Sequence, residues 1–320
     1  MLSRVADSLY WMSRYLERAE HAARSIDVNL NLTLDQSPAP ARLYWRRLLR
    51  SLRLPAEDAE KLDAYQLTQQ LTFDLANSQS LVACITSARE NARQVREHLS
   101  SEMWEQLNRL FWQVKRGNID SVWHDQPHEF FRGVKEGAHL FQGITDSTLA
   151  HGDGWHFILL GRSIERAQDT ASLLDVYFSE TSTDAEAGTG GLDYLEWVGL
   201  LKSCTAFEAY CQVYTADLRP DRIAEFLLLN AEFPRSVRFS VDMMQAALQA
   251  IGRATGARKA GRVERLAGRL RAALDYGQVD EIMAGDVHHY LEDVQRQCAQ
   301  IHAAIYQAYI AYPIETALAS

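Results

Sequence analysis

The pattern Arg-x-x-Glu-Arg occurs twice in the sequence, and its charged residues have the chemistry to bind an anion. A guanidinium group presents a planar fork of N–H donors that matches the oxygens of a carboxylate or a phosphate. Residues three and four apart share one face of a helix, so each copy gathers its three charges. The two copies consist of Arg14, Glu17 and Arg18 and of Arg162, Glu165 and Arg166. If they meet, four arginines face two glutamates, which leaves surplus positive charge for a ligand.

Two other interpretations of the pattern stay open from the sequence. The charges could form a solvated helix face with a weak i, i+3 ion pair, or a purely structural network in the interior. Against a solvated face, the same side of each helix carries bulky apolar residues, namely Tyr10, Trp11 and Val28 in the first copy and Ile158, Leu159, Leu173 and Val176 in the second. We therefore expect both helices to be buried on two sides, where an unpaired charge is costly.

The spacing of apolar residues predicts that helices position these charges. Apolar residues recur at intervals of three and four, and the seven prolines fall where this periodicity pauses. The predicted fold class is all-α, with a surface loop from Ser179 to Gly191. The eleven predicted helices cover residues 4–34, 41–53, 58–75, 79–116, 127–149, 154–180, 191–217, 220–229, 235–252, 258–276 and 279–311.

The two charged patterns belong to a longer internal repeat. Residues 8–30 align with residues 156–178 without gaps at an offset of 148, with seven identical positions. The segment 45–51 then resembles the segment 197–203 at an offset of 152. We expect an internal duplication, with helical halves at 1–150 and 151–320 packed as one globular unit about a pseudo-twofold axis.

Composition limits the classes of partner. The chain has 33 Lys plus Arg against 42 Asp plus Glu, a net charge of -9, which disfavours nucleic acid and anionic membranes as partners. Residues 253–271 are locally basic, and a solvated face or a dock for an acidic protein explains them better than nucleic acid does. The charged N-terminus shows no signal peptide, and no apolar run approaches 18 residues, so we expect a cytoplasmic protein.

Several common kinds of active site are missing from the sequence. It contains no GxxxxGK[ST], GxGxxG or GxSxG segment, and its four cysteines form no CxxC pair, so we interpret them as reduced core residues. His288 with Glu292 and His289 with Asp293 each lie one helical turn apart, a spacing that can share a metal ion. A helix-bundle metal site needs Glu-x-x-His on two helices, and no second copy exists. We expect no metal and no cofactor.

The chain resembles the Alpha-E (α-E) domain family, a bacterial all-α family of unknown function. The resemblance covers essentially the whole chain and rests on MLSRVADSLYWMSRYLERAEHAAR at the start, SARENARQVREHLSSEMWEQLN at 87–108, WHFILLGRSIERAQDT at 155–170, LLKSCTAFEAY at 200–210 and FLLLNAEFPRSVRFSV at 226–241. It implies a partner, a circularly permuted ATP-grasp amidoligase encoded beside or fused to such proteins. A transglutaminase-like peptidase is a further implied companion. The resemblance carries over no catalytic residue.

The matching segments add arginines to the candidate site. Arg89, Glu90 and Arg93 occur at helical spacing in one half. In the other half Arg235 and Arg238 follow Pro234 in the first turn of a helix, where free N–H groups favour anions. A capped helix with surface arginines is the alternative. The predicted anion-binding set is Arg14, Glu17, Arg18, Arg89, Arg162, Glu165, Arg166, Arg235 and Arg238.

Together these observations predict an accessory protein that docks with the ATP-grasp ligase and helps to hold an anionic peptide or acyl-type substrate. The alternative is an enzyme of the same peptide-synthesis or peptide-tagging pathway that uses Glu17 or Glu165 as general acid or base between arginines. A carboxylate between two guanidinium groups should have a lowered pKa, which weakens this alternative. A scaffold without any small-molecule site is a third interpretation.

Overall fold

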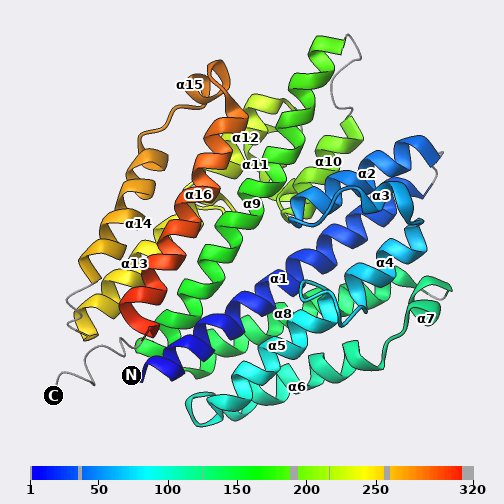
Figure 1. The fold of residues 1–320 in the computed structure, drawn as a ribbon. Helices are drawn as coiled ribbons and strands as arrows, with labels where there is room; N and C mark the ends of the chain where they lie inside the picture. The colour runs from blue at the N-terminus through cyan, green and yellow to red at the C-terminus, as the bar shows by residue number, and fades with distance from the viewer. Residues whose placement is uncertain are drawn as a thin grey trace.

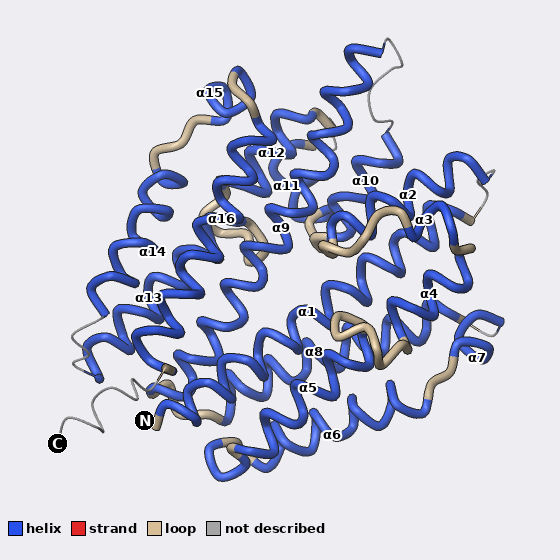
Figure 2. The backbone as a smooth tube through the Cα atoms, viewed as in Figure 1, coloured by secondary structure: helices blue, strands red, loops and turns tan. Residues whose placement is uncertain are grey.

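The computed structural model describes residues 2–34, 38–124, 126–187, 194–215, 217–255 and 260–311. Within these ranges the chain is helical and contains no strand, which confirms the all-α prediction (Figure 2). The sixteen α-helices there are α1 (Ser3–Thr33), α2 (Pro38–Ser51), α3 (Asp58–Lys61), α4 (Ala64–Thr72), α5 (Leu81–Gln94), α6 (Ser101–Arg116), α7 (Ile119–His124), α8 (Pro127–Thr148), α9 (Asp153–Ala187), α10 (Tyr194–Ser203), α11 (Phe207–Tyr214), α12 (Pro220–Leu229), α13 (Val237–Thr255), α14 (Ala260–Asp275), α15 (Val279–Ala284) and α16 (Val287–Ile305).

Four predicted helices are broken by local signals that periodicity does not register. The breaks fall in the predicted helices 58–75, 79–116, 191–217 and 279–311. Side chains of Asp63, Ser100 and Asp286 accept backbone N–H bonds and begin α4, α6 and α16. The break between α10 and α11 contains Thr205, whose φ of 51° is left-handed. A cap or a single left-handed residue therefore ends a helix although the apolar spacing continues.

Two other predictions about the elements were wrong. The helix α9 continues as far as Ala187, so most of the predicted loop from Ser179 to Gly191 is helical. Residues 179–187 contain no glycine or proline that would end the helix. Residues 188–191 lie outside the described residues. The six-residue helix α7 was missed because it is too short to show a period.

The long helices α1 and α9 pack on each other at the centre of the molecule (Figure 1). On one side, α1 packs on α5 and α8, α5 on α6, and α6 on α8. On the other side, α9 packs on α13 and α16, α13 on α14, and α14 on α16. The short helices cross over, because α2 packs on α9 and α10 packs on α1. The same pattern of helix neighbours therefore occurs on both sides of the central pair.

A glycine permits the close approach of the two central helices. A Cβ atom on Gly161 of α9 would lie 2.4 Å from the backbone oxygen of Tyr10 in α1, a distance that real Cβ atoms do not reach. Beside it, the Ser13 hydroxyl donates a hydrogen bond of 2.7 Å to the backbone oxygen of Ile158. Because other helices cover both α1 and α9, polar residues along them are forced into the interior.

None of the described helices combines the length with the apolar character that crossing a bilayer requires.

Candidate functional site

A group of buried charges lies where α1 and α9 pack on each other. We call it the central ionic cluster, and its members are Arg14, Glu17, Arg18, Glu20, Arg24, Arg162, Glu165, Arg166 and Arg235. The three glutamates are almost completely buried, with exposed side-chain fractions of 0–1%. Burial on this scale requires that each carboxylate be paired.

The two repeated motifs exchange partners across the helix pair. Arg18 of α1 donates from Nε to Oε1 of Glu165 at 2.7 Å. Arg166 of α9 donates from Nε to Oε1 of Glu17 at 2.6 Å. Each glutamate thus binds the arginine that follows the glutamate of the opposite motif. The motifs meet in the interior, and the solvated-face interpretation is wrong.

The exchange is not symmetric beyond these two pairs. Glu165 takes its second arginine from α1, since Arg14 Nε lies 2.6 Å from Oε2. The corresponding arginine of α9, Arg162, does not bind Glu17 in this way. Instead Arg235, which lies just before α13, places Nη1 3.2 Å from Oε1 of Glu17. A residue from outside the two repeated motifs thereby supplies the second arginine of Glu17.

Arg235 also joins a second carboxylate to the cluster. Its guanidinium binds Glu20, which in turn binds Arg24 one turn further along α1. The Nε2 atom of His139 lies 3.3 Å from the same carboxylate. Glu20 and Arg24 were missed in the sequence analysis, although their i, i+4 spacing on the motif helix was a usable signal.

The carboxylates of the cluster are held in their ionised form. Burial raises the pKa of Glu165, but Arg14 and Arg18 outweigh it and lower the pKa to about 2. Burial also raises the pKa of Glu17 and of Glu20. The charges of their arginine partners outweigh this effect and hold both pKa values below the usual value of a glutamate. A group with such a low pKa is a weak base and holds no proton to donate near neutral pH.

One buried carboxyl beside the cluster behaves in the opposite way. Burial, together with the charge of Glu165, raises the pKa of Asp169 to about 7 although Arg53 pairs with it. Its Oδ2 atom is buried without a hydrogen-bond partner among the described residues, which explains why desolvation dominates. No sequence signal marked Asp169 or Arg53, because their contact joins α9 to the turn after α2.

Arg162 faces a cavity instead of a glutamate. This Arg162 cavity has a volume of about 240 Å³ and lies between α8, α9 and the region around the start of α13. Its polar lining comprises Gln142, Asp146, Arg162, Ser163, Arg166 and Ser240, and its apolar lining comprises Leu159, Pro234, Phe239 and Met243. The only ion pair of Arg162 with a described residue is a long one, 3.8 Å from Nη1 to Oδ2 of Asp146.

The polar groups at this cavity are incompletely paired. The side chain of Arg162 is only 15% exposed, and burial together with the neighbouring Arg166 lowers its pKa. The hydroxyl of Ser240 is buried and has no hydrogen-bond partner among the described residues. The guanidinium of Arg162 can therefore donate hydrogen bonds to an acceptor in the cavity, and the buried Ser240 hydroxyl is a second unpaired donor in the cavity wall.

The equivalent position in the other motif is closed. The guanidinium of Arg14 lies 4.8 Å from the ring centre of Trp11 and donates to Gln168 at 3.1 Å. At the offset of 148, the smaller Leu159 stands where Trp11 stands. Aromatic cover and a glutamate thus satisfy Arg14, whereas the cavity remains beside Arg162.

Two predicted site residues lie outside the central ionic cluster. Arg89 donates to Asn108 at 2.6 Å and lies over the ring of Phe111. Arg238 lies 3.0 Å from Asp275 and donates to the backbone oxygen of Leu229. Both arginines secure neighbouring helices, so the structure does not bring them to the cavity.

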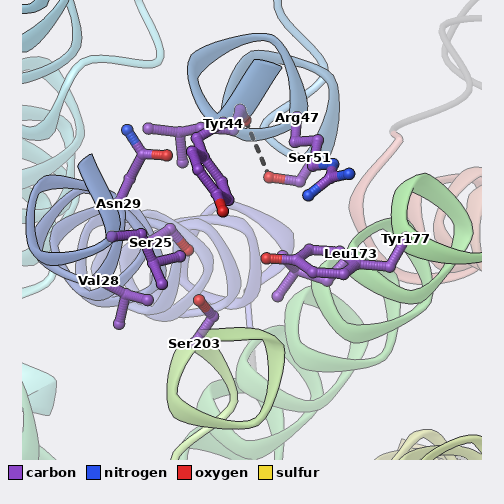
Figure 3. Close-up of a pocket in the computed structure, with 11 residues that line it drawn as sticks. Ser25, Val28, Asn29, Tyr44, Arg47, Ser51, Leu173, Tyr177 and Ser203 are labelled. Atoms are coloured by element: carbon purple, nitrogen blue, oxygen red, sulfur yellow. Dashed lines mark hydrogen bonds between the residues drawn. The ribbon is translucent and has the colours of Figure 1, made fainter. Parts of the chain in front are cut away.

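Two other hollows fit a ligand less well. A cavity of about 20 Å³ lies between α1, α2, α9 and α10, with Ser25 and Ser203 pointing toward each other from two of these helices (Figure 3). It has room for about one water molecule. An open groove of about 500 Å³ lies along α2, α3 and α4, where two cations and two acidic residues balance one another.

The histidine pair considered for metal binding is used in another way. His288 binds Asp175 of α9 through Nδ1, and its Nε2 lies 3.6 Å from Glu292. The described residues contain no group of three or more His, Cys, Asp or Glu side chains placed to hold a metal ion.

Comparisons with known proteins place this geometry in a family context. Residues 1–310 match the family described as "Alpha-E: A predicted alpha-helical domain with a conserved ER motif". The chain is 22% identical, over 326 aligned residues, to an uncharacterized protein of Mycobacterium bovis and to uncharacterized proteins of two strains of Mycobacterium tuberculosis. Each alignment covers 94% of this chain and 35% of the relative, so the chain spans about a third of the length of these relatives. No solved structure gives a significant match.

Proposed function

This chain belongs to the Alpha-E domain family, and on that premise we propose that it is a non-catalytic accessory protein that holds an anionic substrate in the Arg162 cavity. The substrate is a peptide or acyl-type compound on which an ATP-grasp ligase acts. We assign the family's ER motif to the Glu-Arg pairs at 17–18 and 165–166. These two pairs belong to the central ionic cluster beside this cavity.

A single observation carries the proposal, namely the incomplete pairing of Arg162. The central ionic cluster holds six arginines against three glutamates. Five of these arginines contact a glutamate, and the only ion pair of Arg162 with a described residue is the long one with Asp146. A half-buried guanidinium with unused donors gains free energy from an anion that enters the cavity.

An enzyme that uses Glu17 or Glu165 as general acid or base receives less support. Both carboxylates have a lowered pKa, and each is engaged by two arginines. Removing a proton from a substrate would require a stronger base at neutral pH. We expect Glu17→Gln to lower stability, and pathway turnover that stops in a well-folded Glu17→Gln variant would favour the enzyme instead.

We also propose that residues 1–150 and 151–320 arose by duplication of one helical unit. The repeated pattern of helix neighbours and the reciprocal pairs of Glu17 and Glu165 support it. A second correspondence lies in the N-terminal halves of α8 and α16. Asp27 binds His128 and Lys135. Asp175, the counterpart of Asp27 in the repeat, binds His288 and Gln295. These two residues follow His128 and Lys135 at the same offset of 160 positions.

The ligase partnership rests on the family resemblance and on what this sequence lacks. The chain has no phosphate-binding loop of the common kinds, so a partner would have to supply ATP. Relatives in which the matched region is 35% of the length have room for further domains in the same chain. A circularly permuted ATP-grasp ligase is the proposed partner, and a transglutaminase-like peptidase is a second one.

Two measurements test the proposal. In an NMR titration of the full chain with acetate, we expect shifts of residues around the Arg162 cavity that Arg162→Gln abolishes. Arg46→Gln, which changes an exposed arginine paired with Glu60, should leave them intact. Equal shifts in the Arg162→Gln variant would overturn the binding role. Coexpression with an ATP-grasp ligase encoded beside the gene should yield a complex, and failure to associate with or without ATP would remove the partnership.

A further inference from the structure

We propose that the Arg162 cavity binds a free α-amino acid with an apolar side chain. This inference rests on the proposed anion-binding function and narrows it to one class of ligand. Three features of the cavity lead to it: a cation and an anion side by side, an apolar wall, and a small volume.

The paired charges favour a zwitterion over a simple anion. Arg162 and Asp146 both line the cavity, with Nη1 and Oδ2 3.8 Å apart. An α-carboxylate would accept hydrogen bonds from the guanidinium of Arg162. The α-ammonium group of the ligand is bonded to the carbon atom that also bears the carboxylate, so it would lie within reach of Asp146. A phosphate or other dianion would also bind Arg162, but the carboxylate of Asp146 would repel it.

Asp146 is able to serve an incoming ammonium group. Its side chain is 46% exposed, so it lies at the rim of the cavity. The indole Nε1 of Trp155 donates to Oδ1 at 3.0 Å and holds the carboxylate in place. Oδ2, the oxygen nearer Arg162, makes no hydrogen bond with a described residue. The rim therefore offers an oriented acceptor close to the guanidinium.

The rest of the cavity suits an aliphatic side chain. Leu159, Phe239 and Met243 line it beside the charged residues. A ligand that consists of charge alone would leave this wall exposed to water, whereas an apolar side chain would bury it. Cavities for drug-sized ligands have volumes of about 300–1,000 Å³. The volume of about 240 Å³ therefore fits a single amino acid of the size of leucine or methionine.

The experiment compares three ligands that differ by one charged group. L-Leucine carries both groups, 4-methylpentanoate lacks the ammonium group, and leucinamide lacks the carboxylate. In calorimetric titrations of the full chain, we expect leucine to bind at least about tenfold more tightly than either analogue, because each analogue leaves one of the two charges of the site without its partner.

Variants assign this preference to the two charges. In the Asp146→Asn variant, leucine should bind no more tightly than 4-methylpentanoate. In the Arg162→Gln variant, leucine should bind no more tightly than leucinamide. Asp293→Asn is a matched control, since Asp293 is a 41% exposed carboxylate paired with an arginine elsewhere, and it should change neither ratio. If 4-methylpentanoate or phosphate binds as tightly as leucine, the amino-acid inference is overturned while the anion-binding function stands. If none of these compounds nor acetate binds, both are overturned.

Discussion

Arg18 and Glu165 are 147 residues apart in the sequence, and their side chains lie 2.7 Å apart in the interior. The pair joins α1 to α9, and the pair of Arg166 with Glu17 repeats it in the opposite direction. These contacts link the N-terminal and C-terminal groups of helices through charges instead of apolar packing alone. Such a contact is strict about geometry, because a displaced partner leaves a charge in a dry environment.

Removal of one shared carboxylate should therefore be severe. Glu165→Gln leaves Arg14 and Arg18 without their anion, and we expect a loss of about 3–5 kcal/mol in the free energy of unfolding. Urea denaturation followed by circular dichroism measures it. Glu129→Gln removes the partner of Arg132 on the surface of α8 and should cost less than about 0.5 kcal/mol. Similar losses for both variants would contradict the buried network.

Arg162→Gln should behave differently from Glu165→Gln although both lie in the cluster. The side chain of Arg162 is half-buried next to Arg166, and its only ion pair with a described residue is a long one, so its charge contributes little to folding. We expect a urea midpoint equal to or above that of the wild type. A midpoint as low as that of Glu165→Gln would mean that Arg162 is a structural residue.

The close packing of α1 on α9 predicts opposite effects for two glycine substitutions. Gly161→Ala would place Cβ 2.4 Å from the Tyr10 oxygen, so the helices must separate and stability should fall by about 1–3 kcal/mol. Gly143→Ala on α8 meets no atom within 4 Å and should raise stability by about 0.5–1 kcal/mol. Thermal unfolding of the two variants tests the contact, and a neutral Gly161→Ala would refute it.

The pH dependence of stability should contain two components of opposite sign. The pKa of Glu165 is lowered from 4.5 to about 2 in the folded protein, so its contribution is present above pH 4.5 and is lost toward pH 2. The pKa of Asp169 is raised from 3.8 to about 7, so its ionisation weakens the fold as pH rises from 3.8 to 7. We expect Asp169→Asn to be more stable than the wild type above pH 7 and to lose this advantage below pH 4. An unchanged pH profile of urea midpoints would contradict the raised pKa.

Histidine titrations should separate buried rings from paired ones. Burial lowers the pKa of His21 and of His302 to about 4. The hydrogen bond to Asp175 raises the pKa of His288 above its usual 6.5. In an NMR titration, His288 should therefore gain its proton first as pH falls, and His21 and His302 last. Asp175→Asn should bring His288 back toward 6.5, and no change in that variant would disprove the pairing.

Much of the arrangement could be predicted from the sequence because it depends on local periodicity. Apolar residues at intervals of three and four fixed the all-α class, and apolar residues on the charged face of 8–30 indicated that Arg14, Glu17 and Arg18 are buried. Helix ends were predicted less well. Caps such as Asp63 and Ser100 act through one hydrogen bond, and the apolar pattern continues across them.

The amino-acid sequence by itself determined that the charges of the two repeated motifs would lie in the interior, because a helix covered on two faces carries its polar residues inward with it. Only the tertiary structure decided which partner each charge received. Arg235 reaches Glu17 from a segment more than 200 residues away, and no spacing along one helix encodes that approach. That contact separates the otherwise matching arginines: Arg14 is bound by a glutamate, and Arg162 is left beside a cavity.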